Sequence, residues 1–353
     1  MQSVNFWKQL KEPIIGLSPM DGLTDQPFRY ITKKYGSPDV LYTEFTSVEG
    51  LCHGAERLLR EFLYDHSQFP IVAQIYGTTP AYFRQSAILL CQLGFSGIDI
   101  NMGCPAKNVA HSGAGAALIK NPSLALEIIA ATQQGVEDWY QGMSVTDCPD
   151  LTEEVRKVVL QRATELTVDP LHRQQIPVSV KTRVGFDEPV VDSWIPTLLS
   201  TSISAIALHG RTLKQQYSGS ADWELIGKAA EIVRKTDTKM LGNGDINSKE
   251  MALEKCSTYN LSGVLIGRAA LGNPFVFTGE SADTNIFSIA LEHAQLYEDT
   301  FSSQEKYNFL PMRKHLAWYV RAIPNASQIR TRLVLSQSAA EVATILKDFH
   351  LIG

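Results

Sequence analysis

The sequence is poor in cysteine and has no long apolar run. Its five cysteines among 353 residues lie far apart, and they match neither a disulfide framework nor the spacing of a zinc site. We therefore expect a reducing, cytoplasmic setting and no bound metal. No stretch approaches the roughly 18 apolar residues that a membrane helix needs, and residues 1–11 lack the apolar core of a signal peptide. The sequence thus predicts no membrane contact.

The chain also lacks an excess of positive charge. Its 37 acidic side chains outnumber 32 basic ones, which gives a net charge of −5. This balance excludes strong non-specific attraction to nucleic acid over the whole surface, although it leaves room for a local basic groove. The length suffices for one large domain with a smaller one, and 44% hydrophobic with 20% charged residues is typical of globular proteins.

Eight short apolar runs alternate with amphipathic stretches. The runs cover residues 13–20, 40–45, 71–77, 97–103, 178–183, 205–211, 239–245 and 263–269. The amphipathic stretches include residues 26–35, 80–93, 122–134, 223–234 and 248–256. This alternation predicts an α/β protein whose parallel strands close into a (β/α)8 TIM barrel. A doubly wound open sheet ranks second, because no dinucleotide-type glycine fingerprint follows the first run.

Two regions depart from the alternation. About forty residues, 136–175, separate the fourth helix from the fifth strand and contain a predicted charged helix at 151–166. We interpret them as an insertion, because a structureless loop of that length is unusual. After residue 285 only helical periodicity remains. The sequence therefore predicts a barrel over 1–285, followed by a smaller all-helical domain over 286–353.

The predicted helical domain contains basic side chains beside aromatic ones. Arg313, Lys314 and His315 precede Trp318 and Tyr319. RNA-binding surfaces use such residues to contact phosphates and to stack on bases. A solvated helix face with aromatic side chains in the core would give the same pattern, so both interpretations stay open.

Polar side chains stand at the ends of most predicted strands. Active sites of such barrels lie at the carboxyl ends of the strands, and buried polar groups are costly unless they are paired. We therefore predict one binding site at the mouth of the barrel. Its candidate residues are Pro19, Met20, Glu44, Gln74, Asn101, Cys104, Lys181, Arg183, His209, Arg211, Asn243, Gly244, Asp245, Gly267 and Arg268.

The last two strand ends indicate the kind of ligand. Gly244 and Gly267 would let main-chain N–H groups approach a phosphate, and Arg268 adds positive charge. Lys181 and His209 would meet a ring from one side, and the amides at the ends of the third and fourth strands would bond its edge. A phosphorylated ring cofactor is the simplest ligand for this arrangement.

Eight ordered motifs in this chain resemble those of the tRNA-dihydrouridine synthases. They are SPMDGLTD at 18–25, TEF at 43–45, QIYG at 74–77, DINMGCP at 99–105, VKTRVG at 180–185, HGRT at 209–212, NGD at 243–245 and GR at 267–268. Each motif alone is weak, but eight in order are specific, and together they span nearly the whole chain apart from the insertion.

The resemblance implies FMN-dependent reduction of uridines in tRNA to 5,6-dihydrouridine, with NADPH as the electron donor. It implies hydride transfer from the reduced flavin to C6 of a uracil that has been turned out of its stack. Cys104 matches the family's proton donor to C5, and a free thiol with a pKa of about 8.5 is protonated at neutral pH. The helical domain would bind the tRNA, and we expect a monomer without an obligate protein partner.

The resemblance also implies roles for the other candidates. The residues that would hold FMN are Pro19, Met20, Gln74, Lys181, His209, Asn243, Gly244, Asp245, Gly267 and Arg268. The predicted substrate-binding residues are Asn101, Arg183, Arg211, Arg313 and Lys314, of which the first two would lie against the uracil. The glycine-rich run 111–116 is predicted to be a mobile loop that places the thiol, with a packing role for its glycines as the alternative.

Two other functions compete with this interpretation. A small-molecule flavin reductase would share the phosphate site, the lysine and the amides, but the DINMGCP motif and the helical domain favour an RNA substrate. An RNA-binding protein that has lost catalysis is the second competitor. The presence of Cys104, Lys181 and His209 together speaks against it.

Overall fold

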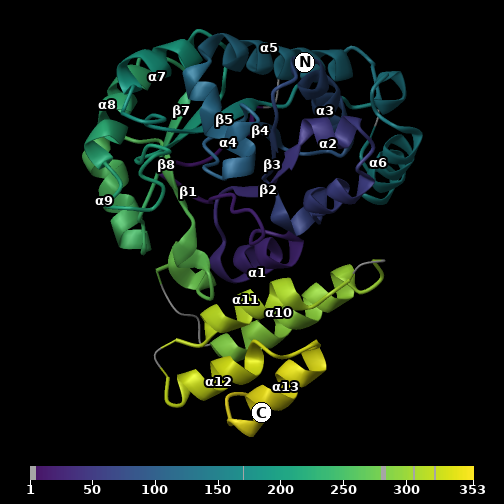
Figure 1. Cartoon of the computed structure of the whole chain (residues 1–353), viewed down its shortest axis with the longest axis vertical. Coiled ribbons are helices and arrows are strands. Elements are labelled where there is room, and N and C mark those ends of the chain that lie inside the picture. Colours follow the sequence, from purple (N-terminus) through teal and green to yellow (C-terminus); the bar gives the residue numbers. More distant parts are fainter. Residues whose placement is uncertain (1–4, 170, 280–283, 305–306, 322) are drawn as a thin grey trace.

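Eight parallel strands form the centre of the molecule (Figure 1). The computed structural model describes residues 5–169, 171–279, 284–304, 307–321 and 323–353. The strands are β1 Ile14–Leu17, β2 Leu41–Ser47, β3 Ile71–Tyr76, β4 Gly97–Met102, β5 Val178–Arg183, β6 Ala205–His209, β7 Lys239–Asn243 and β8 Gly263–Ile266. Each of them overlaps one of the eight predicted apolar runs.

The strands close into a ring. Their order is β1-β8-β7-β6-β5-β4-β3-β2, and every hydrogen-bonded neighbour pair is parallel. The two ends of this series are joined by main-chain bonds: Leu17 N–H donates to the Val40 carbonyl at 2.9 Å, and Asp39 N–H donates to the Ile15 carbonyl at 3.0 Å. The predicted TIM barrel is therefore confirmed, and the open-sheet alternative is wrong.

Helices surround the ring of strands. They are α1 Gln26–Gly36, α2 Val48–Cys52, α3 Pro80–Gln92, α4 Lys107–His111, α5 Pro122–Tyr140, α6 Glu153–Glu165, α7 Val191–Leu199, α8 Trp223–Val233 and α9 Lys249–Tyr259. Short 3-10 helices lie at Phe6–Lys8, Glu56–Phe62, His66–Gln68, Gly115–Lys120, Val145–Asp147, Arg268–Ala270 and Pro274–Phe277. Side-chain oxygens cap several helices, as Asp25 does by accepting the Phe28 N–H at 2.9 Å.

Two apolar clusters fill the barrel on the two sides of its wall. The larger lies between the strands and the outer helices and includes Ile98 and Ile100 of β4 with Phe83 of α3. The smaller joins inward-facing strand residues such as Tyr42 and Leu241 to Phe6 and Trp7 of the first 3-10 turn. Because successive strand residues point to opposite faces, one strand supplies both clusters.

The predicted insertion starts later than the sequence indicated. Helix α5 runs to Tyr140 rather than ending near 134, because Val136 and Trp139 continue its buried face. A 3-10 turn at Val145–Asp147 and α6 follow before β5, and α6 lies inside the predicted helix 151–166. Of the insertion, Pro170 lies outside the described residues.

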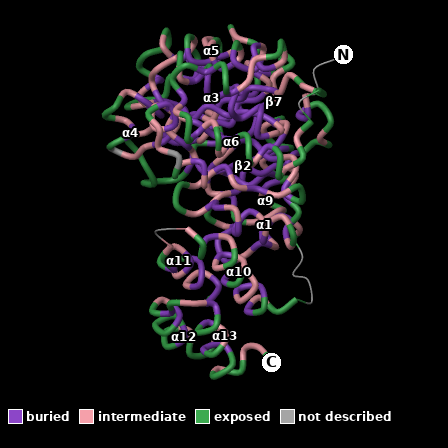
Figure 2. Tube along the Cα trace, turned by 90° about the vertical axis from the view of Figure 1, so that its right-hand side faces the viewer, coloured by how far each residue is buried: buried purple, intermediate pink, exposed green. Residues whose placement is uncertain are grey.

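The C-terminal region is entirely helical where it is described. It contains α10 Ile286–Phe301, α11 Leu310–Tyr319, α12 Ala326–Leu333 and α13 Ala339–Asp348, which pack around a core of their own. Ile31 of α1 belongs to that core, so the region rests on the barrel through α1, as Figures 1 and 2 show. The division into domains at 285/286 stays a prediction, and residues 280–283 beside it are outside the described part of the chain.

Within the described residues, no single helix combines the length and apolarity needed to cross a bilayer. The bent pair Asn108–Lys120 and Pro122–Tyr140 meets the criterion by length and composition only.

Candidate active site

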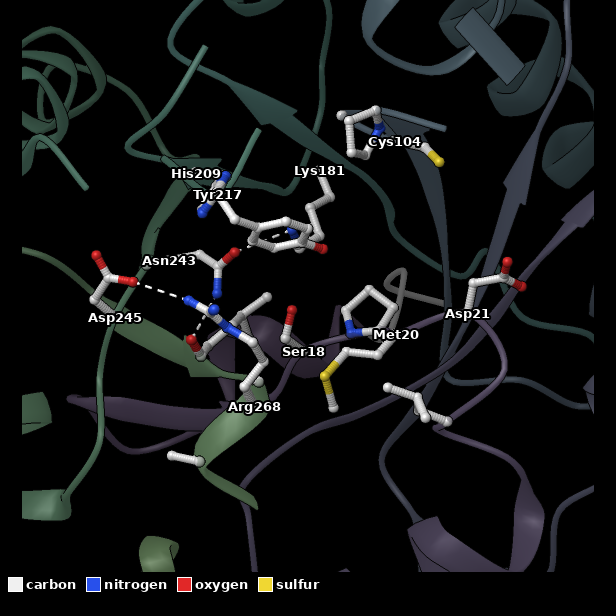
Figure 3. A pocket seen from close by; sticks show the side chains of 18 of the residues that line it. Ser18, Met20, Asp21, Cys104, Lys181, His209, Tyr217, Asn243, Asp245 and Arg268 are labelled. Carbon is white, nitrogen blue, oxygen red and sulfur yellow. Dashed lines mark hydrogen bonds and ion pairs between the residues drawn. The ribbon is translucent and has the colours of Figure 1, made fainter. Parts of the chain in front are cut away.

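A cavity of about 1030 Å³ opens at the carboxyl ends of the strands. Figure 3 shows side chains from several strands and their following loops gathered around it. Thirteen of the predicted site residues line it: Pro19, Met20, Gln74, Asn101, Cys104, Lys181, Arg183, His209, Asn243, Gly244, Asp245, Gly267 and Arg268. The barrel thus brings together residues that are up to 249 positions apart in the chain, from Pro19 to Arg268.

A buried polar chain runs from the barrel interior to the thiol. Asp99 accepts hydrogen bonds from Ser179 Oγ at 2.6 Å and from Gln74 Nε2 at 2.7 Å. Gln74 Oε1 in turn accepts from Asn101 Nδ2 at 3.0 Å, and Asn101 Oδ1 accepts the Cys104 N–H at 2.8 Å. Because each amide is bonded at both ends, the chain fixes the side chain of Asn101 and the main chain that carries Cys104.

Cys104 lies in the cavity wall but is itself largely buried. Its exposed fraction is 8%, and Val109 and Ala114 pack against it. Burial raises the pKa of the thiol above its ordinary value, against a weaker opposing effect of the Ala106 N–H. Arg183 Nε donates to the carbonyl of the preceding Gly103 at 2.6 Å. The thiol is therefore protonated at neutral pH. Hydrogen bonds to the Gly103 carbonyl and from the Cys104 N–H hold the peptide unit that precedes it.

Lys181 and His209 form the wall opposite Met20. Burial, together with the neighbouring Arg183, lowers the pKa of Lys181 to about 8. Its Nζ donates to Asn243 Oδ1 at 3.2 Å, and Asn243 Nδ2 donates to the Leu265 carbonyl at 2.8 Å. Burial and the surrounding cations lower the pKa of His209 to about 2, so its ring is neutral. This wall offers one cationic donor and one neutral imidazole.

The loops after β7 and β8 form a site suited to a phosphate. Within the described chain, the main-chain N–H groups of Gly244, Asp245, Gly267 and Arg268 donate to no other protein group. Gly244 has a φ of +139°, and a Cβ there would lie 2.5 Å from the Cβ of Ala221, so only glycine fits. Free N–H groups beside a guanidinium are the donors that a phosphate needs. These residues therefore fit the predicted phosphate group.

Three predicted substrate-binding residues lie outside the cavity lining. Arg211 is buried behind the wall, where its guanidinium donates to the Gly219 carbonyl and to Asp245 Oδ2, both at 2.6 Å. Arg313 donates to the Ser336 carbonyl at 2.7 Å, between α11 and the start of α13, so it joins helices. Lys314 is exposed on α11. Glu44, also among the polar strand ends, accepts the Leu23 N–H at 2.6 Å behind the β1–α1 loop.

The two open interpretations of the basic and aromatic cluster each hold in part. Tyr319 and His315 are buried in the helical core, as a structural role requires. Trp318, however, lines the cavity, and so does Arg321, which follows it three residues later in the chain. Arg321 was missed because it follows the end of α11, outside the helical pattern that drew attention to the cluster.

Tyr217 is a second residue that sequence patterns missed. Its side chain is 63% exposed on the loop after β6, and the Arg268 guanidinium lies 5.1 Å from its ring centre. Both Tyr217 and His209 line the cavity, and Figure 3 labels them. A tyrosine in a polar loop eight residues beyond the end of β6 has no periodic signal, so only the fold reveals its position.

The glycine-rich run 111–116 packs against Cys104 and Val109. Gly115 has a φ of +60°, and a Cβ there would lie 2.9 Å from Val109 and 3.1 Å from the Cys104 carbonyl. Ala114 and Ala116 are buried. These contacts support the packing role of the glycines, while the mobility of the loop stays a prediction.

Comparison with known proteins agrees with the motifs. The family model described as "Dihydrouridine synthase (Dus)" matches residues 16–145 and 158–350, with its gap inside the insertion. A Staphylococcus aureus (strain Mu50) protein named "Probable tRNA-dihydrouridine synthase" is 34% identical, over 98% of this chain and 96% of that protein. A Bacillus subtilis (strain 168) protein named "Probable tRNA-dihydrouridine synthase 2" is 32% identical, over 98% and 97%.

Two solved structures show a distant likeness to the chain. Morphinone reductase has a TM-score of 0.40 at 8% identity, over 77% of this chain and 87% of that one. Histamine dehydrogenase from Rhizobium sp. 4-9 has a TM-score of 0.45 at 13% identity, over 74% and 44%. The barrel assignment rests on the closed ring of strands, and the family assignment rests on the sequence matches. Because the family model covers most of the chain and the relatives match along nearly its whole length, the chain is an enzyme that belongs to the dihydrouridine synthase family.

Proposed function

We propose that this enzyme reduces uridine in tRNA to 5,6-dihydrouridine, with FMN as its cofactor and NADPH as the electron donor. The observation that carries the proposal is the place of Cys104, a protonated thiol in the wall of the same cavity that contains the phosphate-type site. The curated relatives are named for tRNA, and the small-molecule flavin reductase is correspondingly disfavoured.

The residues that would hold FMN surround the cavity. Gly244, Asp245, Gly267 and Arg268 offer the phosphate donors, because their N–H groups are free within the described chain. The other flavin-contacting candidates are Pro19, Met20, Gln74, Lys181, His209 and Asn243. When bound, FMN would supply the hydride for C6 of the uracil. Arg211 would act from behind by holding Asp245.

The target base would meet Asn101, Arg183 and Cys104. Asn101 and Arg183 are both anchored to the main chain around Gly103 and Cys104, so they share one rigid segment with the thiol. As negative charge develops at C5, Cys104 gives its proton to that carbon, which completes the reduction of the C5–C6 double bond. The high pKa of the thiol keeps it in the acid form before the transfer.

The helical region would meet the RNA beside the cavity. Trp318 and Arg321 of this region line the cavity together with the barrel residues, and Lys314 is exposed on the same helix as Trp318. An aromatic ring and cations at the entrance suit a base that must leave its stack, because they would contact its flanking bases and phosphates. Arg313, in contrast, is engaged with Ser336 and is the weakest of the proposed tRNA contacts. Cytoplasmic location and a monomeric state stay predictions.

An anaerobic reoxidation experiment tests the proposal. The purified flavoprotein is reduced with NADPH and mixed with tRNA transcribed without modifications, while the visible absorbance of the flavin is followed. We expect rapid reoxidation and the appearance of dihydrouridine in the recovered tRNA. Enones and dihydroorotate-type substrates serve as controls and should leave the flavin reduced. Reoxidation by these small molecules alone, or a purified protein that takes up no flavin, would contradict the proposal.

A further inference from the structure

A buried cluster of metal-ligating side chains lies where the barrel meets the helical region. Asp25 precedes α1 of the barrel, His293 belongs to α10, and His315 belongs to α11. One ligand-type atom from each of the three lies within 4.8 Å of the others, and all three residues are buried. The function proposed above uses none of them.

The two imidazoles lack the partners that buried rings normally have. Among the described residues, His315 has no hydrogen-bond partner at either ring nitrogen, and His293 has none at Nε2. The exposed fraction is 1% for His315 and 0% for His293. A neutral imidazole has one N–H donor and one acceptor, and leaving both unmatched in a closed interior is unfavourable. Phe28 packs on both rings, with centroid distances of 5.1 and 6.0 Å, so the neighbouring apolar wall offers no substitute.

The remaining contacts resemble those around a bound metal. The hydroxyl of Tyr319 lies 3.1 Å from His293 Nδ1, which fixes that ring and leaves Nε2 as its open nitrogen. Metal-bound histidines are commonly held in this way through their other nitrogen. Asp25 uses Oδ1 to cap α1, and a carboxylate has a second oxygen to give.

We propose that Asp25, His293 and His315 bind one divalent transition-metal ion of the Zn²⁺ class, which joins the helical region to the barrel. Two imidazoles and a carboxylate are ligands that Zn²⁺ accepts at about 2.0–2.2 Å, with a water as the fourth. In tetrahedral coordination at those distances the ligand atoms lie about 3.4 Å apart. The three ligand atoms, which lie within 4.8 Å of one another, would therefore draw closer on binding.

The site would control the geometry of the cavity entrance. Asp25 directly follows the loop 20–24, whose Met20, Asp21 and Leu23 line the cavity. His315 stands one turn before Trp318, which also lines the cavity. An ion that ties these elements together would hold the helical region at a fixed position over the mouth of the barrel. The sequence indicated no metal site because its three ligands come from distant segments without short spacing.

Metal binding is measured on the whole purified protein, independently of flavin and tRNA. The protein is stripped with a chelator, dialysed and titrated with Co²⁺ as a spectroscopic substitute and with Zn²⁺ in competition. We expect one ion per chain, visible cobalt bands without a thiolate-to-cobalt charge-transfer band, and a higher melting temperature with Zn²⁺. A wild-type protein that binds no Co²⁺ or Zn²⁺, or a cobalt spectrum with thiolate bands, would overturn the proposal.

Two variants and a control locate the ion. Asp25→Asn keeps an oxygen that can cap α1 but loses the carboxylate charge, and His293→Gln removes one imidazole. Each variant should weaken Co²⁺ binding by about 100-fold or more. Even the loss of a residue that only hydrogen-bonds to a metal ligand lowers metal affinity by about 10- to 100-fold. The exposed His53→Gln serves as the matched control and should bind normally. Undiminished binding in both ligand variants would refute the site, and the wild-type spectrum still decides if either variant fails to fold.

Discussion

The two ends of the barrel are built by the same strands but hold opposite kinds of side chain. At the amino end, Val72, Ala207 and Leu241 point inward and pack against Phe6 and Trp7. Two residues further along the same faces, the inward positions carry polar groups that line the cavity, namely Gln74, His209 and Asn243. Since side chains two apart share a face of a strand, each strand changes from apolar to polar within about 7 Å.

The amino end of the barrel therefore contributes mainly to stability, and the mouth contributes mainly to activity. The apolar layer at the amino end gains free energy by leaving water, and the turn Phe6–Lys8 seals it. The polar layer at the mouth is stabilised only where its members bond one another, as in the chain from Asp99 to Asn101. Substitutions at the two ends should therefore alter different measured quantities.

The largest expected effect is on the reaction rate, from Cys104→Ala at the mouth. Removal of a positioned acid typically slows a reaction by roughly 10²- to 10⁴-fold, so the reoxidation of reduced flavin by tRNA should slow by that factor. Binding of tRNA and the melting temperature should change little. The matched control is Cys256→Ala, which removes a buried thiol of α9 far from the cavity. A Cys104→Ala enzyme with normal turnover would remove the thiol from the mechanism.

The next largest effect is on stability, from Trp7→Ala at the amino end. Trp7 is 1% exposed and its indole packs on Phe6 with a centroid distance of 4.6 Å. Its removal leaves a cavity, and we expect a loss of about 3–5 kcal/mol in the free energy of unfolding, measured by urea titration. The Phe side chain of the Trp7→Phe variant fills most of that space, so this variant should lose less free energy of unfolding. FMN affinity of the folded variant should stay unchanged, and a parallel loss of affinity would mean that the two layers are coupled.

The sequence predicted which residues line the mouth of the barrel better than it predicted the side-chain contacts behind that lining. Alternating apolar runs place a strand and its final polar residue, and the parallel barrel then brings those residues to one end. This is why thirteen candidates from Pro19 to Arg268 line one cavity. The pattern does not tell which way a long side chain turns, so Arg211 was expected at the substrate although its charge is matched by Asp245 within the wall.

Residues on loops and helix ends could not be placed from periodicity. Tyr217, Trp318 and Arg321 reach the cavity because the loop after β6 and the end of α11 lie over the mouth. Their position depends on packing between segments about a hundred residues apart. The end of α5 was misplaced for a related reason, since Trp139 is buried and prolongs the helix past the polar residues that suggested its end.

A smaller effect is expected on the pH dependence of FMN binding. The pKa of Lys181 is lowered to about 8, so its ammonium group is lost as the pH rises through that value. If the cation assists FMN, the affinity is constant below pH 8 and falls above it by up to tenfold, about 1.4 kcal/mol, per pH unit. The phosphate of FMN is already ionised in this range. Fluorescence titrations of FMN into protein stripped of flavin, from pH 7 to 9, measure how the affinity changes with pH. The Lys181→Met variant should bind FMN more weakly, and its affinity should not fall above pH 8. The same slope in both proteins would assign the titration to another group.

The smallest effect is expected from the exposed ion pair beside the seal at the amino end. Lys8 Nζ lies 3.0 Å from Asp237 Oδ2, but the two side chains are 57% and 91% exposed. Water and salt screen such a pair, and holding two long side chains together costs entropy, so Asp237→Asn should change the free energy of unfolding by only about 0.2–1 kcal/mol. The change should shrink further at 1 M salt. A loss as large as that of Trp7→Ala would mean that the charge, rather than the buried indole, holds the turn Phe6–Lys8 against the barrel. A small effect that shrinks further at 1 M salt would assign the seal to apolar packing, as its burial predicts.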